Sequence, residues 1–120
     1  MLSAFSHVML YVNDVDRAAK WYEKHLGFKP RQMYAPHYGI LFHDGIKFRL
    51  DLHPANTDSG NIGHGPQVYF TCDDLDATVA SLRSAGVSVE DPRSEGGSAR
   101  FTSFKDGDGN VLGLMAKSQW

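Results

Sequence analysis

The sequence is poor in cysteine, and this scarcity limits its chemistry. Its one cysteine, Cys72, has no second thiol with which to form a disulfide bond within the chain or to share a zinc ion. A reducing cytoplasm is the compartment we expect, because no other address is visible. Cys72 falls among the apolar positions of an alternating segment, which indicates a small buried core residue and not a catalytic thiol.

Long apolar runs and basic clusters are also missing. No apolar segment approaches the roughly 20 residues that a membrane helix needs, and the N-terminus lacks the basic and apolar regions of a signal peptide. The 12 basic and 14 acidic residues leave a net charge of −2 and form no run of Lys or Arg. We therefore expect no membrane segment and no nucleic-acid partner.

The chain has the length and composition of one compact domain. Of its 120 residues, 42% are hydrophobic and 22% are charged, which is ordinary for a globular protein. A chain of this length buries roughly two-thirds of the surface that its unfolded form exposes. It can therefore form a core without disulfide bonds, and disorder is not expected.

A repeated pattern divides the chain into two halves. Residues 7–28 read HVMLYVNDVDRAAKWYEKHLGF, and residues 67–87 read QVYFTCDDLDATVASLRSAGV. Each segment has an alternating strand, an Asp that can cap a helix, an apolar helical stripe and a Gly that ends the helix. His7 and Gln67 open the two copies, so the same position in each copy becomes a candidate site.

Each copy begins a module of one strand, one helix and about three further strands. The modules lie at about residues 1–55 and 67–118, and a linker rich in Gly, Asn, Asp, Ser and Pro joins them at residues 54–66. Alternation and turn residues predict the further strands at residues 29–34, 38–43, 47–52, 87–90, 99–105 and 111–116.

Several motifs carry a resemblance to a known family. They are His7, the repeated Asp-x-Asp, Leu26-Gly27-Phe28, and the run FKDGDGN at residues 104–110. Together they resemble the vicinal oxygen chelate superfamily, which includes glyoxalase I, extradiol dioxygenases, and the fosfomycin and bleomycin resistance proteins. The resemblance implies an α+β fold in which two tandem βαβββ modules form curled mixed sheets around a cavity. It also implies a homodimer.

The resemblance further implies where a metal would bind. Metal-dependent members take ligands from the first and last strands of each module, and the matching positions are His7, Asp51, Gln67 and Gly113. Gly113 stands where the family usually has Glu, and glycine has no side chain that can bind a metal. One imidazole and one amide make a poor divalent site, so no cofactor is favoured. If a divalent metal is bound, His7, Asp51 and Gln67 are its expected ligands.

The strand faces turned away from the helices are the expected ligand site. Residues 47–53 alternate charged and apolar side chains, so Arg49 and Asp51 share such a face. The face is either a solvated outer strand or a cavity wall on which Arg49 holds an anionic group through bidentate hydrogen bonds. Apolar walls with a few polar groups suit an organic or aromatic ligand. The predicted ligand-binding residues are His7, Met9, Tyr11, Arg49, Asp51, Gln67, Tyr69 and Met115.

Three functions are open at this point. The favoured one is a glyoxalase/bleomycin resistance-like protein that binds a small organic molecule in its cavity without a metal. The second is a metal-dependent lyase or dioxygenase of the glyoxalase type. The third is a metal-free enzyme with His7 as its general base, which makes His7 the candidate catalytic residue.

Overall fold

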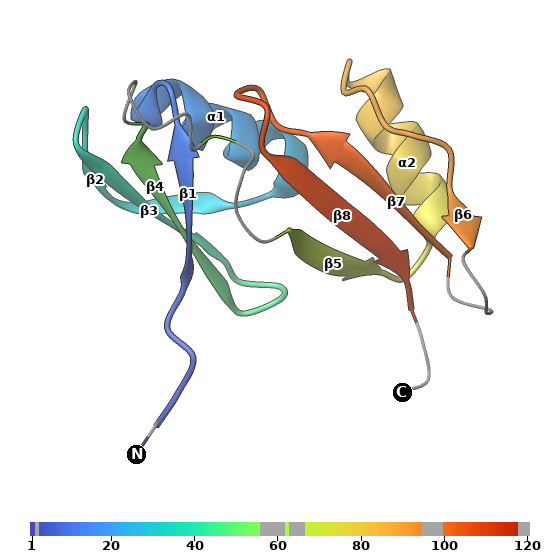
Figure 1. The fold of residues 1–120 in the computed structure, drawn as a ribbon, viewed down its shortest axis with the longest axis horizontal. Helices are drawn as coiled ribbons and strands as arrows, with labels where there is room; N and C mark the ends of the chain where they lie inside the picture. Colours follow the sequence, from blue (N-terminus) through green and yellow to red (C-terminus); the bar gives the residue numbers. More distant parts are fainter. Residues whose placement is uncertain (2, 56–61, 63–66, 95–99, 118–120) are drawn as a thin grey trace. The chain divides into compact units, whose positions relative to one another are not determined.

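The two tandem modules that the repeat predicts are present in the structure. The computed structural model describes residues 1, 3–55, 62, 67–94 and 100–117, so most of the predicted linker lies outside the described residues. The chain divides into two compact units, Met1–His64 and Gly65–Trp120. Each unit has one long helix and one four-stranded mixed sheet (Figure 1).

Unit 1 forms the first βαβββ module. Its strand order is β1-β4-β3-β2, with β1 parallel to β4 and the other neighbours antiparallel. This order places β4 in the interior of the sheet, between β1 and β3. The elements are β1 (Val8–Val12), α1 (Val15–Leu26), β2 (Lys29–Tyr34), β3 (Tyr38–His43) and β4 (Phe48–Pro54).

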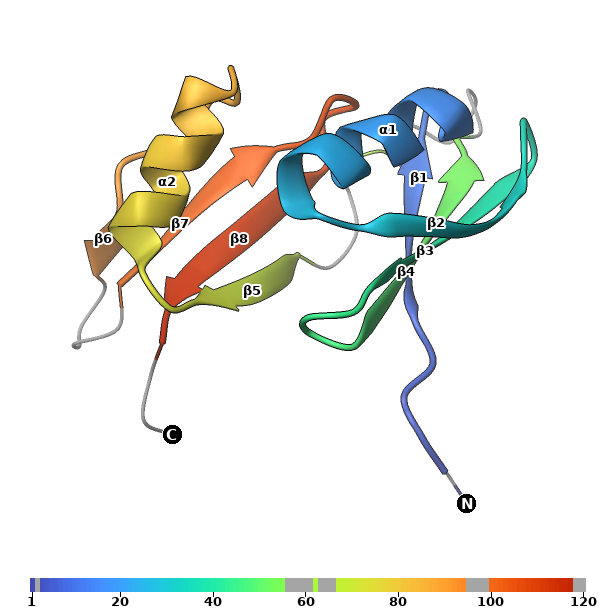
Figure 2. The same ribbon diagram turned by 180° about the vertical axis from the view of Figure 1, so that it is seen from behind.

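Helix α1 forms where the sequence predicts it. The Asp14 carboxylate accepts a hydrogen bond from the Arg17 backbone N–H at 3.0 Å, which satisfies one of the free donors of the first turn. Val15, Ala18, Ala19 and Tyr22 form its buried stripe. Gly27 ends the helix in the left-handed region at a φ of 79°. The helix thereby covers one face of its sheet and leaves the other face for function (Figure 2).

Unit 2 repeats this plan, but its edge strand β6 is only two residues long. Its strand order is β5-β8-β7-β6, with β5 parallel to β8. The carboxylate of Asp74 caps α2 through the Ala77 N–H at 3.0 Å, as Asp14 caps α1. The elements are β5 (Val68–Cys72), α2 (Leu75–Ser84), β6 (Arg93–Ser94), β7 (Arg100–Lys105) and β8 (Val111–Ala116).

The strand predicted at residues 87–90 is wrong. There, Val89 makes only an isolated bridge to Phe104, and the edge strand β6 begins later, inside a predicted loop. Val87 and Val89 are both buried, so apolar residues recur at every second position of this segment. Burial thus produced the period-two pattern without a full ladder of backbone hydrogen bonds.

The core of each unit lies between its helix and its sheet. In unit 1, Leu50 and Leu52 of β4 are at most 1% exposed, and in unit 2 the thiol of Cys72 is buried and its pKa is raised by that burial. Cys72 is therefore the core residue that the sequence predicts. Within the described residues, no helix is long and apolar enough to cross a membrane.

Candidate ligand-binding site

Asp51 is the centre of the polar cluster in unit 1. It lies on the interior strand β4, opposite Met9 of β1 and Ile40 of β3. Its side chain points to the face that α1 does not cover, yet it is completely buried. A buried carboxylate must be paired to remain ionised, so its neighbours decide its chemistry.

Three polar residues surround the carboxylate. Arg49 donates through Nε to Oδ1 and through Nη2 to Oδ2, both at 2.8 Å, which is the bidentate arrangement. The Tyr38 hydroxyl donates to Oδ2, and His7 Nε2 lies 3.5 Å from the same oxygen. Each oxygen of Asp51 therefore already has a partner within the chain.

These contacts set the protonation state of the cluster. Burial favours the neutral acid, but the hydrogen bonds from Arg49 and Tyr38 outweigh it, and the pKa of Asp51 is lowered. Burial and the bond to Asp51 together raise the pKa of Tyr38. At neutral pH the cluster thus holds an ionised carboxylate, a neutral phenol and a guanidinium cation.

His7 lies between two partners, just ahead of β1. Its Nδ1 is 2.8 Å from the Ser6 hydroxyl, and its Nε2 faces Asp51. About a third of its side chain is exposed, so solvent or a ligand can reach the ring. With Nε2 facing the carboxylate, Nδ1 is the nitrogen left to accept a proton, and the Ser6 hydroxyl lies within hydrogen-bond distance of it.

Aromatic side chains extend this face of unit 1. The rings of Tyr11 and Tyr38 both meet His53 edge to face, with centroid separations of 5.6 Å and 6.0 Å. Met9 lies beside Asp51 in the neighbouring strand and is 36% exposed. Tyr38 was not among the predicted residues. Its place in the strand 38–43, on the same alternating face as Asp51's partner Ile40, is the signal that could have found it.

In unit 2 the centre of the equivalent face is Gly113. Tyr69 is its register partner across β5 and β8. A Cβ atom built on Gly113 would lie 2.2 Å from two atoms of the Tyr69 ring, so the ring lies directly over the glycine. The Tyr69 hydroxyl donates to Gln67 Oε1 at 3.3 Å. The ring is 41% exposed and presents its outer side to solvent.

The predicted site residues thus fall into two groups. Unit 1 brings together His7, Arg49 and Asp51, with Met9 and Tyr11 on the same face. Unit 2 brings together Gln67 and Tyr69, and Met115 lies two residues beyond Gly113. Neither a solvated outer strand nor an open anion site describes Arg49 and Asp51. Arg49 makes its bidentate contact with Asp51 itself, because two opposite charges on one face satisfy each other.

The positions that would hold a metal in this family do not fit one. The Asp51 oxygens face a guanidinium cation, which repels a metal ion, and Gly113 lies under a phenol ring. Within the part of the chain that the structure describes, no three His, Cys, Asp or Glu side chains gather in a way that could hold a metal. The mixed imidazole and carboxylate set that divalent catalysis uses is therefore not assembled by these residues.

Comparisons with known proteins agree with the observed fold. Residues 4–114 match the model of the Glyoxalase/Bleomycin resistance protein/Dioxygenase superfamily. A search of curated proteins gave no match. Among solved structures, an antibiotic binding protein from Streptomyces sp. CB03234 is 28% identical, with a TM-score of 0.73 over 98% of this chain and 100% of that one.

Two further structures share the fold at lower identity. A superfamily member from Sphaerobacter thermophilus is 22% identical, with a TM-score of 0.80 over 98% of this chain and 100% of its own. A lactoylglutathione lyase from Agrobacterium tumefaciens is 19% identical, with a TM-score of 0.74 over 96% and 94%. With its paired βαβββ units and a family match over nearly its whole length, the chain belongs to the glyoxalase/bleomycin resistance protein/dioxygenase superfamily.

Proposed function

We propose that this protein binds a small aromatic molecule without a metal. The observation that carries the proposal is the Tyr69 ring lying over Gly113, where the family usually has a Glu. An exposed ring replaces the carboxylate there, and aromatic faces bind planar organic molecules. The similarity to an antibiotic binding protein at 28% identity supports the same class of function.

The cluster around Asp51 also supports binding without a metal. Its charges are satisfied internally, so it acts as a fixed polar wall and not as an open ligand set. Met9 and Tyr11 are accessible beside this wall and offer a thioether and a ring to an organic ligand. We expect the ligand to be sequestered or sensed.

Metal analysis and ligand screening test the proposal together. Protein purified without chelator is expected to carry no stoichiometric transition metal by mass spectrometry. A thermal-shift screen is then expected to give higher melting temperatures with some planar aromatic compounds, since a ligand that binds only the folded state stabilises it. The Tyr69→Ala variant should lose most of that shift.

Two results would overturn this function. One is a stoichiometric metal that disappears in His7→Ala, which would favour the metal-dependent lyase or dioxygenase. The other is a screen in which no aromatic compound raises the melting temperature.

A metal-free enzyme is the second candidate. It is favoured by one observation, the 3.5 Å separation of His7 Nε2 and the buried Asp51 carboxylate, which orients the imidazole. General-base catalysis would show as deuterium uptake from heavy water into a bound ligand that has an acidic C–H, measured by NMR. His7→Gln should abolish this uptake when both proteins are compared at a ligand concentration that saturates each of them. Equal uptake in the two proteins would exclude His7 as the base.

A further inference from the structure

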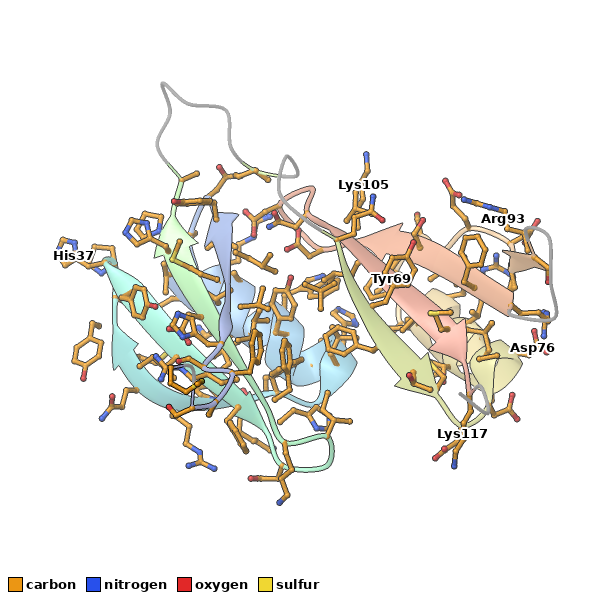
Figure 3. All side chains as sticks on the ribbon, turned by 60° about the horizontal axis from the view of Figure 1, so that its bottom comes forward. His37, Tyr69, Asp76, Arg93, Lys105 and Lys117 are labelled. Atoms are coloured by element: carbon orange, nitrogen blue, oxygen red, sulfur yellow. The ribbon has the colours of Figure 1, made fainter. Side chains whose placement is uncertain are left out.

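The face of the unit 2 sheet that α2 does not cover brings residues of three strands into one row. Register places Gly113 of β8 between Tyr69 of β5 and Ser103 of β7. The buried Leu112 and Leu114 alternate with Gly113 and face the other way. Tyr69, Gly113 and Ser103 therefore form one row across the sheet, and Figure 3 shows Tyr69 projecting from it.

The Tyr69 ring forms the apolar part of this surface. It rests on the bare backbone of Gly113, so its outer side is not blocked by a side chain from that position. Its hydroxyl is held by Gln67 at 3.3 Å, which fixes the direction of the ring. A tyrosine over a glycine can serve sheet stability alone. A role in binding therefore needs a second feature beside it.

Lys105 is that second feature. It pairs with Val111 in the register of β7 and β8, which puts it on the same face as Tyr69, two residues along the strand from Ser103. Two residues span about 7 Å in a strand, and β8 separates β7 from β5 by about 10 Å in all. A planar ligand on Tyr69 must therefore extend across β8 to bring an anionic group to the flexible Lys105 side chain. Lys105 is exposed, and no acidic group among the described residues lies within ion-pair distance of it.

The charge of this face differs from that of the face in unit 1. On unit 1 the cation of Arg49 is offset by Asp51. On unit 2 the described strand positions of the face hold Lys105 but no Asp or Glu. The Arg93 guanidinium lies over the Phe101 ring at 4.9 Å at the far edge, where it also pairs with the Glu90 carboxylate at 3.4 Å, so it adds no unbalanced charge. Lys105 is therefore the described cation of this face that is left for an anion, whereas Arg49 is already paired with Asp51.

We propose that this face of unit 2 binds an aromatic carboxylate, with the ligand ring stacked on Tyr69 and its carboxylate held by Lys105 and the Ser103 hydroxyl. The inference rests on the aromatic binding function proposed above and names its ligand class. It assigns Tyr69 and Lys105 as the residues that determine specificity. The sequence suggested Arg49 as the residue that holds an anionic group of the ligand, and this proposal assigns that role to Lys105.

Calorimetric titration with 2-naphthoate and its uncharged amide, 2-naphthamide, tests this assignment in the full chain. The wild type is expected to bind the carboxylate more tightly than the amide, and added salt should weaken only the carboxylate. Lys105→Met should weaken 2-naphthoate binding about 2- to 5-fold, the range for an exposed ion pair, and leave 2-naphthamide unchanged. Tyr69→Leu should weaken both compounds by about 3- to 10-fold through lost ring stacking.

Lys117→Met is the matched control. Lys117 is the other lysine of unit 2, lies beyond the opposite end of β8 and pairs with Asp73 at 3.8 Å (Figure 3). The Lys117→Met variant loses the same positive charge as Lys105→Met, but it should bind both compounds as the wild type does. Lys105→Arg should restore the preference for the carboxylate, and melting temperatures will show that every variant is folded.

The outcomes separate this inference from the function on which it rests. Binding of 2-naphthoate that is unchanged in Lys105→Met, or no binding of 2-naphthoate at all, overturns the assignment of this face. Other aromatic compounds could still bind the metal-free protein in that case, and the broader proposal would stand. A stoichiometric metal lost in His7→Ala would instead remove the broader proposal.

Discussion

At the scale of single residues, the carboxylate of Asp51 controls unit 1. This buried charge has three polar neighbours: His7 just before β1, Tyr38 of β3 and Arg49 of β4. Removing a buried acceptor is costlier than removing an exposed one, because its former donors lose their partner away from water. Stability and the shape of the candidate site are therefore linked through this one side chain.

Asp51→Ala is expected to destabilise the fold measurably. The half-buried Tyr38 hydroxyl loses its acceptor, which costs about 1–3 kcal/mol in the free energy of unfolding. Urea denaturation monitored by circular dichroism gives that free energy. Asp44→Ala is the control, since Asp44 forms only an exposed pair with Arg31 at 3.3 Å. Its effect should stay below about 1 kcal/mol, and equal effects of the two changes would contradict the role of Asp51.

The stability that Asp51 supplies should depend on pH in one direction. Its folded-state pKa lies below the ordinary value of 3.8, so its contribution is complete above that value and is lost as the pH falls through the folded-state pKa. Unfolding of the wild type and Asp51→Asn should be compared from neutral pH downward. The difference between them should be constant until about pH 4 and shrink below it. The hydrogen bond from Arg100 also lowers the pKa of Asp76, but Asp76 is present in both proteins, so its contribution cancels in the difference between their unfolding free energies.

Much of this cluster follows from the sequence, but its pairing does not. Alternation along residues 47–53 places Arg49 and Asp51 on one face, and the repeat marks His7. Alternation fixes which side of a sheet a side chain takes and says nothing of its rotamer or of which strand lies next to it. Tyr38 becomes a partner of Asp51 only because β3 pairs with β4 in one particular register.

At the scale of elements, the pairing of β5 with β8 defines unit 2. The helices, the caps and most strands were predictable because apolar periodicity and capping residues are local signals. The strand predicted at residues 87–90 failed because burial mimics strand alternation. The contact between Tyr69 and Gly113 joins residues far apart in the chain, so a single sequence gives no signal for it.

Gly113→Ala should test that pairing. The new Cβ would lie 2.2 Å from the Tyr69 ring, so the ring must swing away from the sheet. We expect a loss of about 1–2 kcal/mol in stability, the range for an overpacked position. A double-mutant cycle with Tyr69→Ala checks the cause, because the alanine at 113 should cost little once the ring is gone. Additive effects of the two changes would show that the ring and the glycine are not in contact.

At the scale of the whole molecule, the chain is two units built on one plan with different surfaces. Unit 1 carries a neutralised polar cluster, and unit 2 carries an aromatic and cationic face. Unit 1 leaves large apolar side chains exposed, among them Phe5 at 74% and Ile46 at 49%. Single exposed apolar residues are normal on a folded protein and do not by themselves identify an interface.

The homodimer that the family resemblance implies stays a prediction for the whole molecule. Light scattering coupled to size-exclusion chromatography should give twice the chain mass across micromolar concentrations. Ile46→Asp should shift the mass towards one chain if that turn lies in the interface, and Lys47→Asp at the neighbouring exposed position controls for the added charge. A mass of one chain at every concentration would exclude the dimer.

The tyrosine over Gly113 also restricts the mutational paths open to this protein. Some glycine codons become glutamate codons through a single nucleotide change, so a carboxylate at position 113 is genetically close. That change alone would drive its side chain into the ring of Tyr69, because even a Cβ atom has no room there. A glutamate at position 113 would therefore force the Tyr69 ring off the sheet, and a smaller residue at position 69 would remove that cost. The contact therefore couples positions 69 and 113, so that a change at one alters the cost of a change at the other.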